Sequence, residues 1–115
     1  FVRRPTAPVA ILIGGWTASS GEFLAVAFIG RPRTALFGQD SAGYLTANEP
    51  FELSDGATMV LATAIAVDRR GIKTGDRLEP DYVVQQQPLD TKLEDDKTIV
   101  AAKEWVQRHA ECRRN

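Results

Sequence analysis

Two adjacent serines, Ser19 and Ser20, lie in a stretch of small residues that could present a hydroxyl nucleophile. Residues 14–22 read Gly-Gly-Trp-Thr-Ala-Ser-Ser-Gly-Glu and follow the apolar run at 9–13. A serine in a turn between a buried strand and a helix can hold its oxygen above the end of a sheet, where the N–H of the next residue stabilises an oxyanion. Acyl transfer to serine is therefore one chemistry that these residues support. The alternative is that the serines only cap a core helix.

Trp16 borders this turn and has two possible uses. Its large apolar ring is expected to fill the core, and the alternative is that it walls a pocket beside the serines. His109 and Cys112 are the single histidine and the single cysteine of the chain. Because His109 falls at the end of a predicted helix and Cys112 has no basic partner, neither is expected to take part in catalysis.

The composition limits the functions that are possible. The chain has 115 residues, 43% of them hydrophobic and 25% charged, which is typical of one globular domain. Fourteen Lys+Arg against fifteen Asp+Glu give a formal charge of -1, so no nucleic-acid partner is expected. The residues for a structural zinc site are lacking and we expect no metal and no cofactor. The longest apolar run, at 9–13, is too short for a membrane span.

The elements around the serines predict an α/β fold. Residues 9–13 are entered from a proline and left through two glycines, a pattern that predicts a central strand buried on both faces of a mostly parallel sheet. Residues 23–29 predict a helix with Ser19 or Ser20 as its N-cap and Glu22 in its first turn, where a carboxylate favours the positive end of the helix dipole. Residues 33–37 predict a second strand, parallel to the first.

The second half of the chain predicts a hairpin and a terminal helix. Residues 49–53 and 58–67 are predicted to be the two strands of a hairpin, joined by an Asp-Gly turn at Asp55. A short edge strand is expected at 82–84, after Asp81, whose carboxylate is expected to accept hydrogen bonds from nearby backbone N–H groups. The last helix starts near residues 95–96 and carries apolar side chains at spacings of three and four.

Five short motifs in this order resemble the carboxy-terminal processing (tail-specific) serine protease family. The resemblance runs over residues 9–84, about two thirds of the chain. The five motifs are Thr-Ala-Ser-Ser-Gly-Glu at 17–22, Gly-Gln at 38–39, Ser-Ala-Gly at 41–43, Leu-Ser-Asp-Gly at 53–56 and Pro-Asp at 80–81. The resemblance implies that Ser19, three residues before Glu22, is the nucleophile and that the N–H of Ser20 binds the oxyanion.

The resemblance also assigns the remaining site residues. Family members with a Ser/Lys dyad carry lysine directly after the glycine that Gly43 matches, whereas this chain has Tyr44, and a neutral phenol is a poor default base. The pattern is closer to the branch that uses a histidine from an earlier segment and a downstream acid, for which Asp76 or Glu79 is the candidate. Gly43, Tyr44 and Trp16 are then expected to bind substrate.

The resemblance implies a wider organisation. Residues 1–88 would be the C-terminal part of a peptidase catalytic domain with a Clp-protease-like or crotonase-like core, and residues 89–115 a helical segment packed on it. Because the chain begins with a Pro-rich basic segment at Phe1, we expect it to be part of a longer protein. Its partners would be a peptide or protein substrate and the remainder of the parent chain or a second copy, and its location the bacterial cell envelope or periplasm.

Two other functions fit the same residues. One is a non-catalytic peptide-binding module that kept the groove and lost its base, which Tyr44 favours. The other is an acyl-thioester enzyme of the crotonase type, in which backbone N–H groups polarise a thioester and no serine is required, although a shared fold does not by itself give a function.

Overall fold

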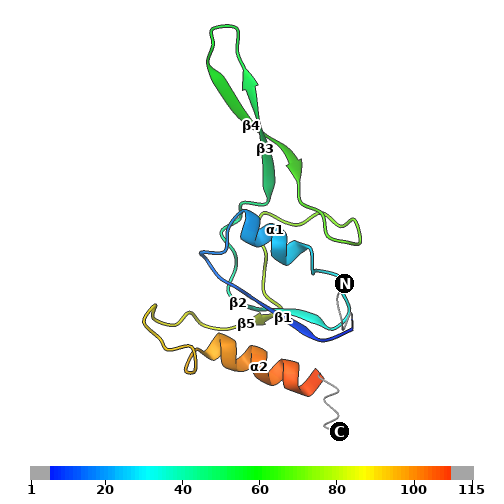
Figure 1. The fold of residues 1–115 in the computed structure, drawn as a ribbon, viewed down its shortest axis with the longest axis vertical. Helices are drawn as coiled ribbons and strands as arrows, with labels where there is room; N and C mark the ends of the chain where they lie inside the picture. The colour runs from blue at the N-terminus through cyan, green and yellow to red at the C-terminus, as the bar shows by residue number, and fades with distance from the viewer. Residues whose placement is uncertain (1–5, 110–115) are drawn as a thin grey trace.

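Three parallel strands form the sheet that positions the serine turn. The computed structural model describes residues 6–109, so Cys112 lies outside the described part. β1 (Val9–Ile13) pairs with β2 (Thr34–Gly38), and β2 pairs with the two-residue β5 (Tyr82–Val83), in the order β1-β2-β5. α1 (Ser20–Val26) connects β1 to β2, and α2 (Lys97–His109) closes the described chain. The expected α/β class and the parallel pairing of the first two strands are confirmed (Figure 1).

The sheet is covered on both faces by one helix each (Figure 1). On one face Leu36 packs with Ala25 and Val26 of α1. On the other face Phe37 packs with Ala102 and Trp105 of α2. Successive residues of β2 therefore point to opposite helices, and four of its five residues are buried. The Phe37 ring also stacks on Tyr82 at 4.7 Å, which holds the short β5 against the sheet.

The predicted central position of residues 9–13 is wrong for the described residues, because β1 lies at the edge of this sheet and β2 at its centre. Only Ile13 of β1 is buried, and Leu12 is 45% exposed. The apolar run arises because helices cover both faces of the strand. Hydrophobicity reports on the faces of a strand and says nothing of its two hydrogen-bonding edges.

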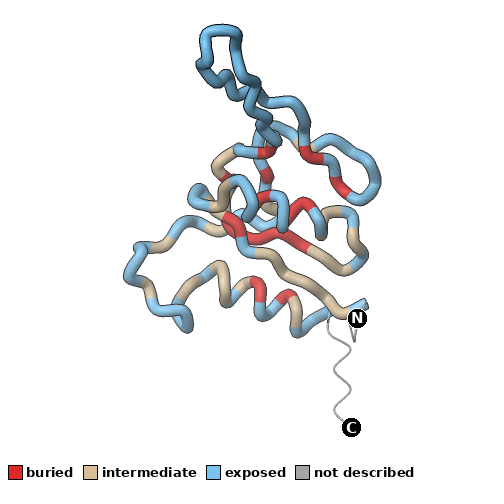
Figure 2. Tube along the Cα trace, turned by 45° about the horizontal axis from the view of Figure 1, so that its top comes forward, coloured by how far each residue is buried: buried red, intermediate tan, exposed pale blue. Residues whose placement is uncertain are grey.

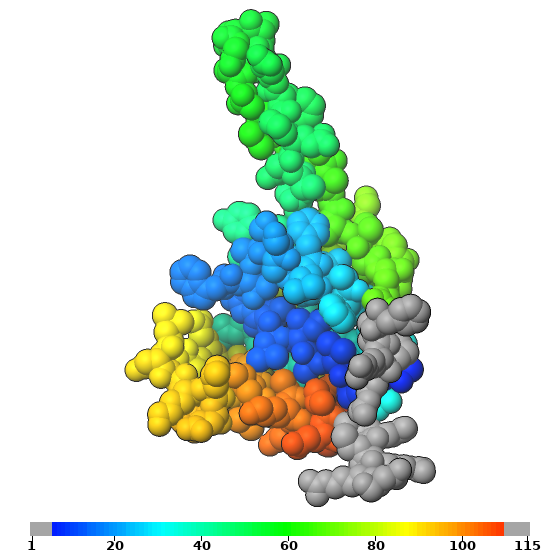
Figure 3. Space-filling model, viewed as in Figure 1, coloured from blue at the N-terminus to red at the C-terminus, as the bar shows by residue number. Residues whose placement is uncertain are grey.

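A hairpin projects from this core as a separate two-stranded sheet (Figures 1 and 3). β3 (Thr46–Glu52) and β4 (Thr58–Ile65) are antiparallel, and every residue in both strands is exposed (Figure 2). Asp55 accepts a hydrogen bond from the Ala57 N–H at 3.0 Å, which confirms it as a turn residue. The first strand of the hairpin begins three residues earlier than expected, because Thr46 already pairs with Ile65.

The terminal helix begins as expected. Asp96 Oδ1 accepts hydrogen bonds from the N–H groups of Thr98 (2.8 Å) and Ile99 (3.3 Å), so Asp96 is its N-cap. The largest side chain on its buried face is Trp105, which is 6% exposed.

Candidate active site

The chain leaves β1 through a tight turn that leads directly to the serines. The Thr17 N–H donates to the Gly14 carbonyl at 2.8 Å, and the Gly14 N–H donates to Thr17 Oγ1 at 3.1 Å. These two hydrogen bonds fix the turn at the carboxyl end of the sheet. Ser19 and Ser20 follow it at the start of α1, and both are exposed.

Ser19 has a strained backbone. Its φ of 50° and ψ of -117° lie in a region that costs a residue with a side chain on the order of 1–3 kcal/mol. Such strain is typical of the sharp strand-to-helix turn that holds a serine oxygen above the end of a sheet. Ser20 is the first residue of α1, and its N–H donates no hydrogen bond within residues 6–109. The two serines therefore differ: one has the strained backbone, and the other offers a free N–H beside it.

Glu22 is the residue that holds this turn in place. Its side chain is 0% exposed and accepts four hydrogen bonds. Oε2 accepts from the N–H groups of Ser19 and Tyr44, each at 2.8 Å. Oε1 accepts from the Gly43 N–H at 2.8 Å and from the Ser41 hydroxyl. Because the backbone nitrogens of Ser19 and Tyr44 both donate to Oε2, these two nitrogens lie no farther apart than twice 2.8 Å.

The carboxylate of Glu22 is kept ionised. Burial alone would raise its pKa, but the hydrogen bonds from the Ser41 hydroxyl and from the backbone of Gly43, Ser19 and Tyr44 outweigh that effect and hold the pKa below its usual value of 4.5. An ionised acceptor forms stronger hydrogen bonds than a neutral one. The charge of Glu22 therefore ties residues 19 and 41–44 together.

Ser41 extends the network to a third segment. Its hydroxyl donates to Glu22 and accepts from the Leu78 N–H at 2.8 Å, and its own N–H donates to the Leu78 carbonyl at 2.9 Å. The neighbouring Ala42 N–H donates to the Thr17 carbonyl at 2.9 Å. Three segments far apart in the sequence are thus joined around one carboxylate.

Two glycines are required by close backbone contacts beside this network. Gly38, at the end of β2, has a φ of +121°, and a Cβ there would lie 2.1 Å from the Ile13 carbonyl oxygen. Gly43 has a φ of +92°, and a Cβ there would lie 2.9 Å from the Asp76 carbonyl oxygen. Any larger residue would force β1 from β2, or residues 41–44 from Asp76.

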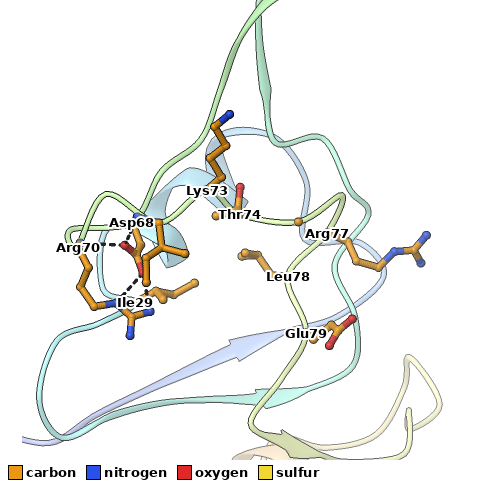
Figure 4. A pocket seen from close by; sticks show the side chains of 10 residues that line it. Ile29, Asp68, Arg70, Lys73, Thr74, Arg77, Leu78 and Glu79 are labelled. Atoms are coloured by element: carbon orange, nitrogen blue, oxygen red, sulfur yellow. Dashed lines mark hydrogen bonds and ion pairs between the residues drawn. The ribbon is translucent and has the colours of Figure 1, made fainter.

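The two candidate acids, Asp76 and Glu79, lie in different parts of the structure. The backbone of Asp76 lies against Gly43, within the group of segments that Glu22 joins, and its side chain is exposed. Glu79 instead lines a cavity of about 330 Å³ with Ile29 and Asp68 (Figure 4). Ile29 follows the C-terminal end of α1, so Glu79 lies at the end of that helix opposite to Ser19.

Asp68, which lines the cavity of Figure 4, is a buried carboxylate that holds its surroundings together as Glu22 does at the serine turn. Asp68 is buried and accepts hydrogen bonds from the Arg70 guanidinium, the closest at 2.6 Å, and from the N–H groups of Arg70 and Ile72. The Arg70 guanidinium is the main reason why the pKa of Asp68 lies below its usual value. Lys73 and Arg77 also line the cavity, and in Figure 4 the charged ends of their side chains point outward.

Trp16 does not fill the core as expected, because it is 86% exposed. It lines a cavity of about 450 Å³ outside the carboxyl ends of β1 and β2, together with Thr17 and Gln39. Turn residues 14–17 follow the end of β1, and Trp16 belongs to neither core cluster that residues 6–109 form. Tyr44 is also exposed, at 65%, and only its backbone is held by Glu22.

Two residues of this network, Glu22 and Ser41, are not among the site residues predicted from the sequence. Glu22 was assigned to the helix dipole, although a serine followed three residues later by glutamate also predicts the hydrogen bond from the Ser19 N–H to the Glu22 carboxylate. The link to Ser41 had no sequence signal, because it arises from the way residues 39–45 fold back over α1. Asp81 was assigned correctly, since its carboxylate accepts the Leu36 N–H at 2.8 Å.

Neither a metal centre nor a membrane span emerges from residues 6–109. No three potential His, Cys, Asp or Glu ligands gather in that part of the chain, and neither of its helices has the length and apolarity needed to cross a bilayer.

A family model, a curated protein and solved structures are similar to this chain. The model of peptidase family S41 matches residues 2–84. The nisin-resistance protein of Lactococcus lactis subsp. lactis is 33% identical over 100 residues, which are 87% of this chain and 28% of that protein. A solved lipoprotein from Streptococcus agalactiae is 36% identical with a TM-score of 0.65, over 90% of this chain and 32% of that one.

The photosystem II D1 C-terminal processing protease has a similar structure, with a TM-score of 0.62 and 27% identity over 76% of this chain and 23% of that one. The chain therefore spans a third or less of the length of each of these three relatives.

Proposed function

The chain belongs to peptidase family S41, and on this premise we propose that its parent protein is a serine endopeptidase of the tail-specific, carboxy-terminal processing class with Ser19 as its nucleophile. The observation that carries the proposal is the strained backbone of Ser19 at the start of α1, next to the N–H of Ser20, which donates no hydrogen bond within residues 6–109. A helix cap does not require a φ of 50°, since ordinary N-cap residues adopt extended backbone angles.

In the proposed reaction the Ser19 oxygen attacks the carbonyl carbon of the scissile peptide bond while its proton passes to a general base. The Ser20 N–H donates a hydrogen bond to the resulting oxyanion. When the carbon–nitrogen bond breaks, the leaving amine takes the proton, and the acyl group stays on Ser19. Water then loses a proton to the same base, attacks the ester and releases the carboxylic acid, and the proton returns to Ser19.

The general base is proposed to be a histidine of the parent protein outside this chain. Tyr44 occupies the position where the dyad branch of the family has lysine, and its backbone lies beside Ser19. A phenol there can donate a hydrogen bond to substrate but is a poor base for a serine hydroxyl. Of the two candidate acids, the location of Asp76 beside Gly43 favours it over Glu79.

The fold proposed for the parent is a Clp-protease-like or crotonase-like core, to which residues 1–88 contribute the C-terminal part. β1 is the place where the rest of that core would join. Its outer edge has no partner strand within residues 6–109, and an apolar hollow between it and α2, lined by Leu12, Ile99 and Val106, lies next to that edge. We propose that the remainder of the parent chain covers this edge, with a second copy as the alternative occupant.

The name of one relative suggests a substrate to test. The protein from Lactococcus lactis that is 33% identical to this chain is named for resistance to nisin. We propose that nisin be tested as a substrate of the parent protein, beside unrelated peptides. Cleavage of nisin that depends on Ser19 would support a role in resistance, and cleavage of the other peptides alone would limit the proposal to general peptidase activity.

A non-catalytic peptide-binding module is the second candidate, and the observation that favours it is the tyrosine at the lysine position. Peptide hydrolysis by the full-length parent decides between the two. Ser19→Ala is expected to lower kcat/KM by on the order of 10⁴ or more, as for other serine enzymes, whereas Ser20→Ala keeps the backbone N–H and most of the activity. A loss below tenfold for Ser19→Ala would exclude Ser19 as the nucleophile.

A further inference from the structure

Large apolar side chains gather at one place outside the core. Among the described residues the four most exposed large hydrophobic side chains are those of Leu89, Trp16, Val83 and Leu93, at 89%, 86%, 79% and 75%. Three of them, Leu89, Trp16 and Leu93, line the same cavity of about 450 Å³. Exposed apolar groups that line one hollow are typical of a binding site, because scattered ones need no explanation and clustered ones are costly in water.

The cavity lies next to the proposed nucleophile. Thr17 is part of its lining, and only Ala18 separates Thr17 from Ser19. Thr17 and Ser19 are therefore at most about 7 Å apart along the chain, which is about the length of two residues of an extended peptide substrate. The cavity also lies outside the carboxyl ends of β1 and β2, where ligands bind in open parallel sheets. A peptide with its scissile carbonyl at Ser19 can therefore place a nearby side chain in this hollow.

The charges of the cavity restrict which side chain fits. Among the described residues Asp96 is the only charged one in the lining, and Asp96 Oδ1 already accepts hydrogen bonds from the N–H groups at the start of α2. The other polar side chains in the lining are neutral: the amides of Gln39, Gln86 and Gln87 and the hydroxyls of Thr17, Thr91 and Thr98. A carboxylate would find no cation there and would face another carboxylate, whereas an apolar side chain would cover Trp16, Leu89 and Leu93.

We propose that this cavity is the subsite for a large apolar side chain of the peptide substrate within two residues of the scissile bond, and that Trp16 is its specificity-determining residue. The proposal rests on the proposed peptidase function and deepens it by naming the side-chain class that is selected. The site disfavours acidic residues at this position.

The test uses the full-length parent protein and fluorogenic peptides that differ at one position near the cleaved bond, with leucine, phenylalanine, alanine or aspartate. The wild type is expected to cleave the leucine and phenylalanine peptides roughly 10- to 100-fold faster in kcat/KM than the alanine peptide, the range for burying one such side chain. The aspartate peptide is expected to be the slowest. Trp16→Ala is expected to reduce this preference at least tenfold, because the leucine and phenylalanine peptides lose more of their kcat/KM than the alanine peptide does.

Leu24→Ala is the matched control, because Leu24 is 65% exposed on α1 and does not line the cavity. It is expected to leave the preference unchanged, and Trp16→Phe is expected to retain most of it. An equal loss for all four peptides in Trp16→Ala, or an unchanged preference, would overturn the proposal. A fall in melting temperature with no change in preference would show that another part of the parent covers Trp16, and would overturn it as well.

A binding measurement keeps this inference separate from the proposed reaction. In the Ser19→Ala protein the leucine peptide is expected to bind at least tenfold more tightly than the aspartate peptide, and adding Trp16→Ala is expected to remove this difference. If the wild type cleaves no peptide but this binding difference is present, the proposed hydrolysis fails and the subsite stands. If the wild type cleaves peptides through Ser19 but the two peptides bind equally, the subsite fails and the hydrolysis stands.

Discussion

Replacing Glu22 by glutamine tests whether one buried carboxylate holds the serine turn. The substitution keeps the size of the side chain and removes its charge. Four donors point at the two oxygens of Glu22, two at each. A glutamine keeps one oxygen, and its NH₂ group then faces two of the donors, so at least two hydrogen bonds to a charged acceptor are lost.

Each such hydrogen bond contributes about 1.5–3 kcal/mol, so the local structure is expected to lose about 3–6 kcal/mol. Since 1.4 kcal/mol corresponds to a factor of ten, local opening becomes roughly 100-fold or more frequent. Hydrogen exchange of the full-length protein, followed by mass spectrometry, measures this opening at residues 17–24 and 41–45. Glu52→Gln is the matched control, because Glu52 is exposed on the hairpin. Unchanged exchange in Glu22→Gln would refute the reasoning.

The same carboxylate predicts a dependence on pH. Because the folded protein lowers the pKa of Glu22 below 4.5, its stabilisation is complete above the unfolded value and is lost as the pH falls through the folded value. The difference in melting temperature between wild type and Glu22→Gln is therefore expected to be largest above pH 4.5 and to shrink in more acidic buffer. A difference that grows in acid would contradict the assignment.

Three further predictions concern other parts of the site. Tyr44→Phe is expected to keep appreciable peptidase activity, since the phenol is not the base; a loss as complete as that of Ser19→Ala would place the phenol in the proton path. Gly38→Ala is expected to cost at least about 3 kcal/mol in thermal unfolding, because its Cβ would lie 2.1 Å from the Ile13 oxygen, whereas Gly56→Ala, also at positive φ but with nothing within 4 Å, is expected to cost only about 1 kcal/mol. The isolated 115-residue chain is expected to be inactive and to self-associate through the β1 edge in light scattering; a monomer whose β1 amides are strongly protected from exchange would show that this edge needs no partner.

The elements could be predicted from the sequence where the signal was local. The Asp-Gly turn and the start of the last helix at Asp96 follow from residues next to one another, and the parallel pairing of the first two strands follows from the order strand, helix, strand. The position of β1 at the edge could not, because the edge of a strand has no pattern of its own and depends on which other segments are present.

The site could be predicted only in part for the same reason. Ser19 and Ser20 stand out by their small neighbours, but a strained φ is a property of the folded turn. Ser41 and Leu78 are far from Glu22 in the sequence and meet it only after the chain folds back. Trp16 was expected in the core because large rings usually are, and only the position of its turn beyond the end of β1 shows why it stays exposed.

Covalent labelling by a fluorophosphonate probe tests the central claim most directly. The full-length wild-type protein is expected to gain one adduct, which mass spectrometry of the digested protein locates on Ser19. Labelling is expected to disappear in Ser19→Ala and to persist in Ser20→Ala, because the backbone N–H at position 20 is unchanged. Labelling that survives Ser19→Ala and disappears in Ser20→Ala, or an active protein that is never labelled, would contradict the assignment of Ser19 as the nucleophile.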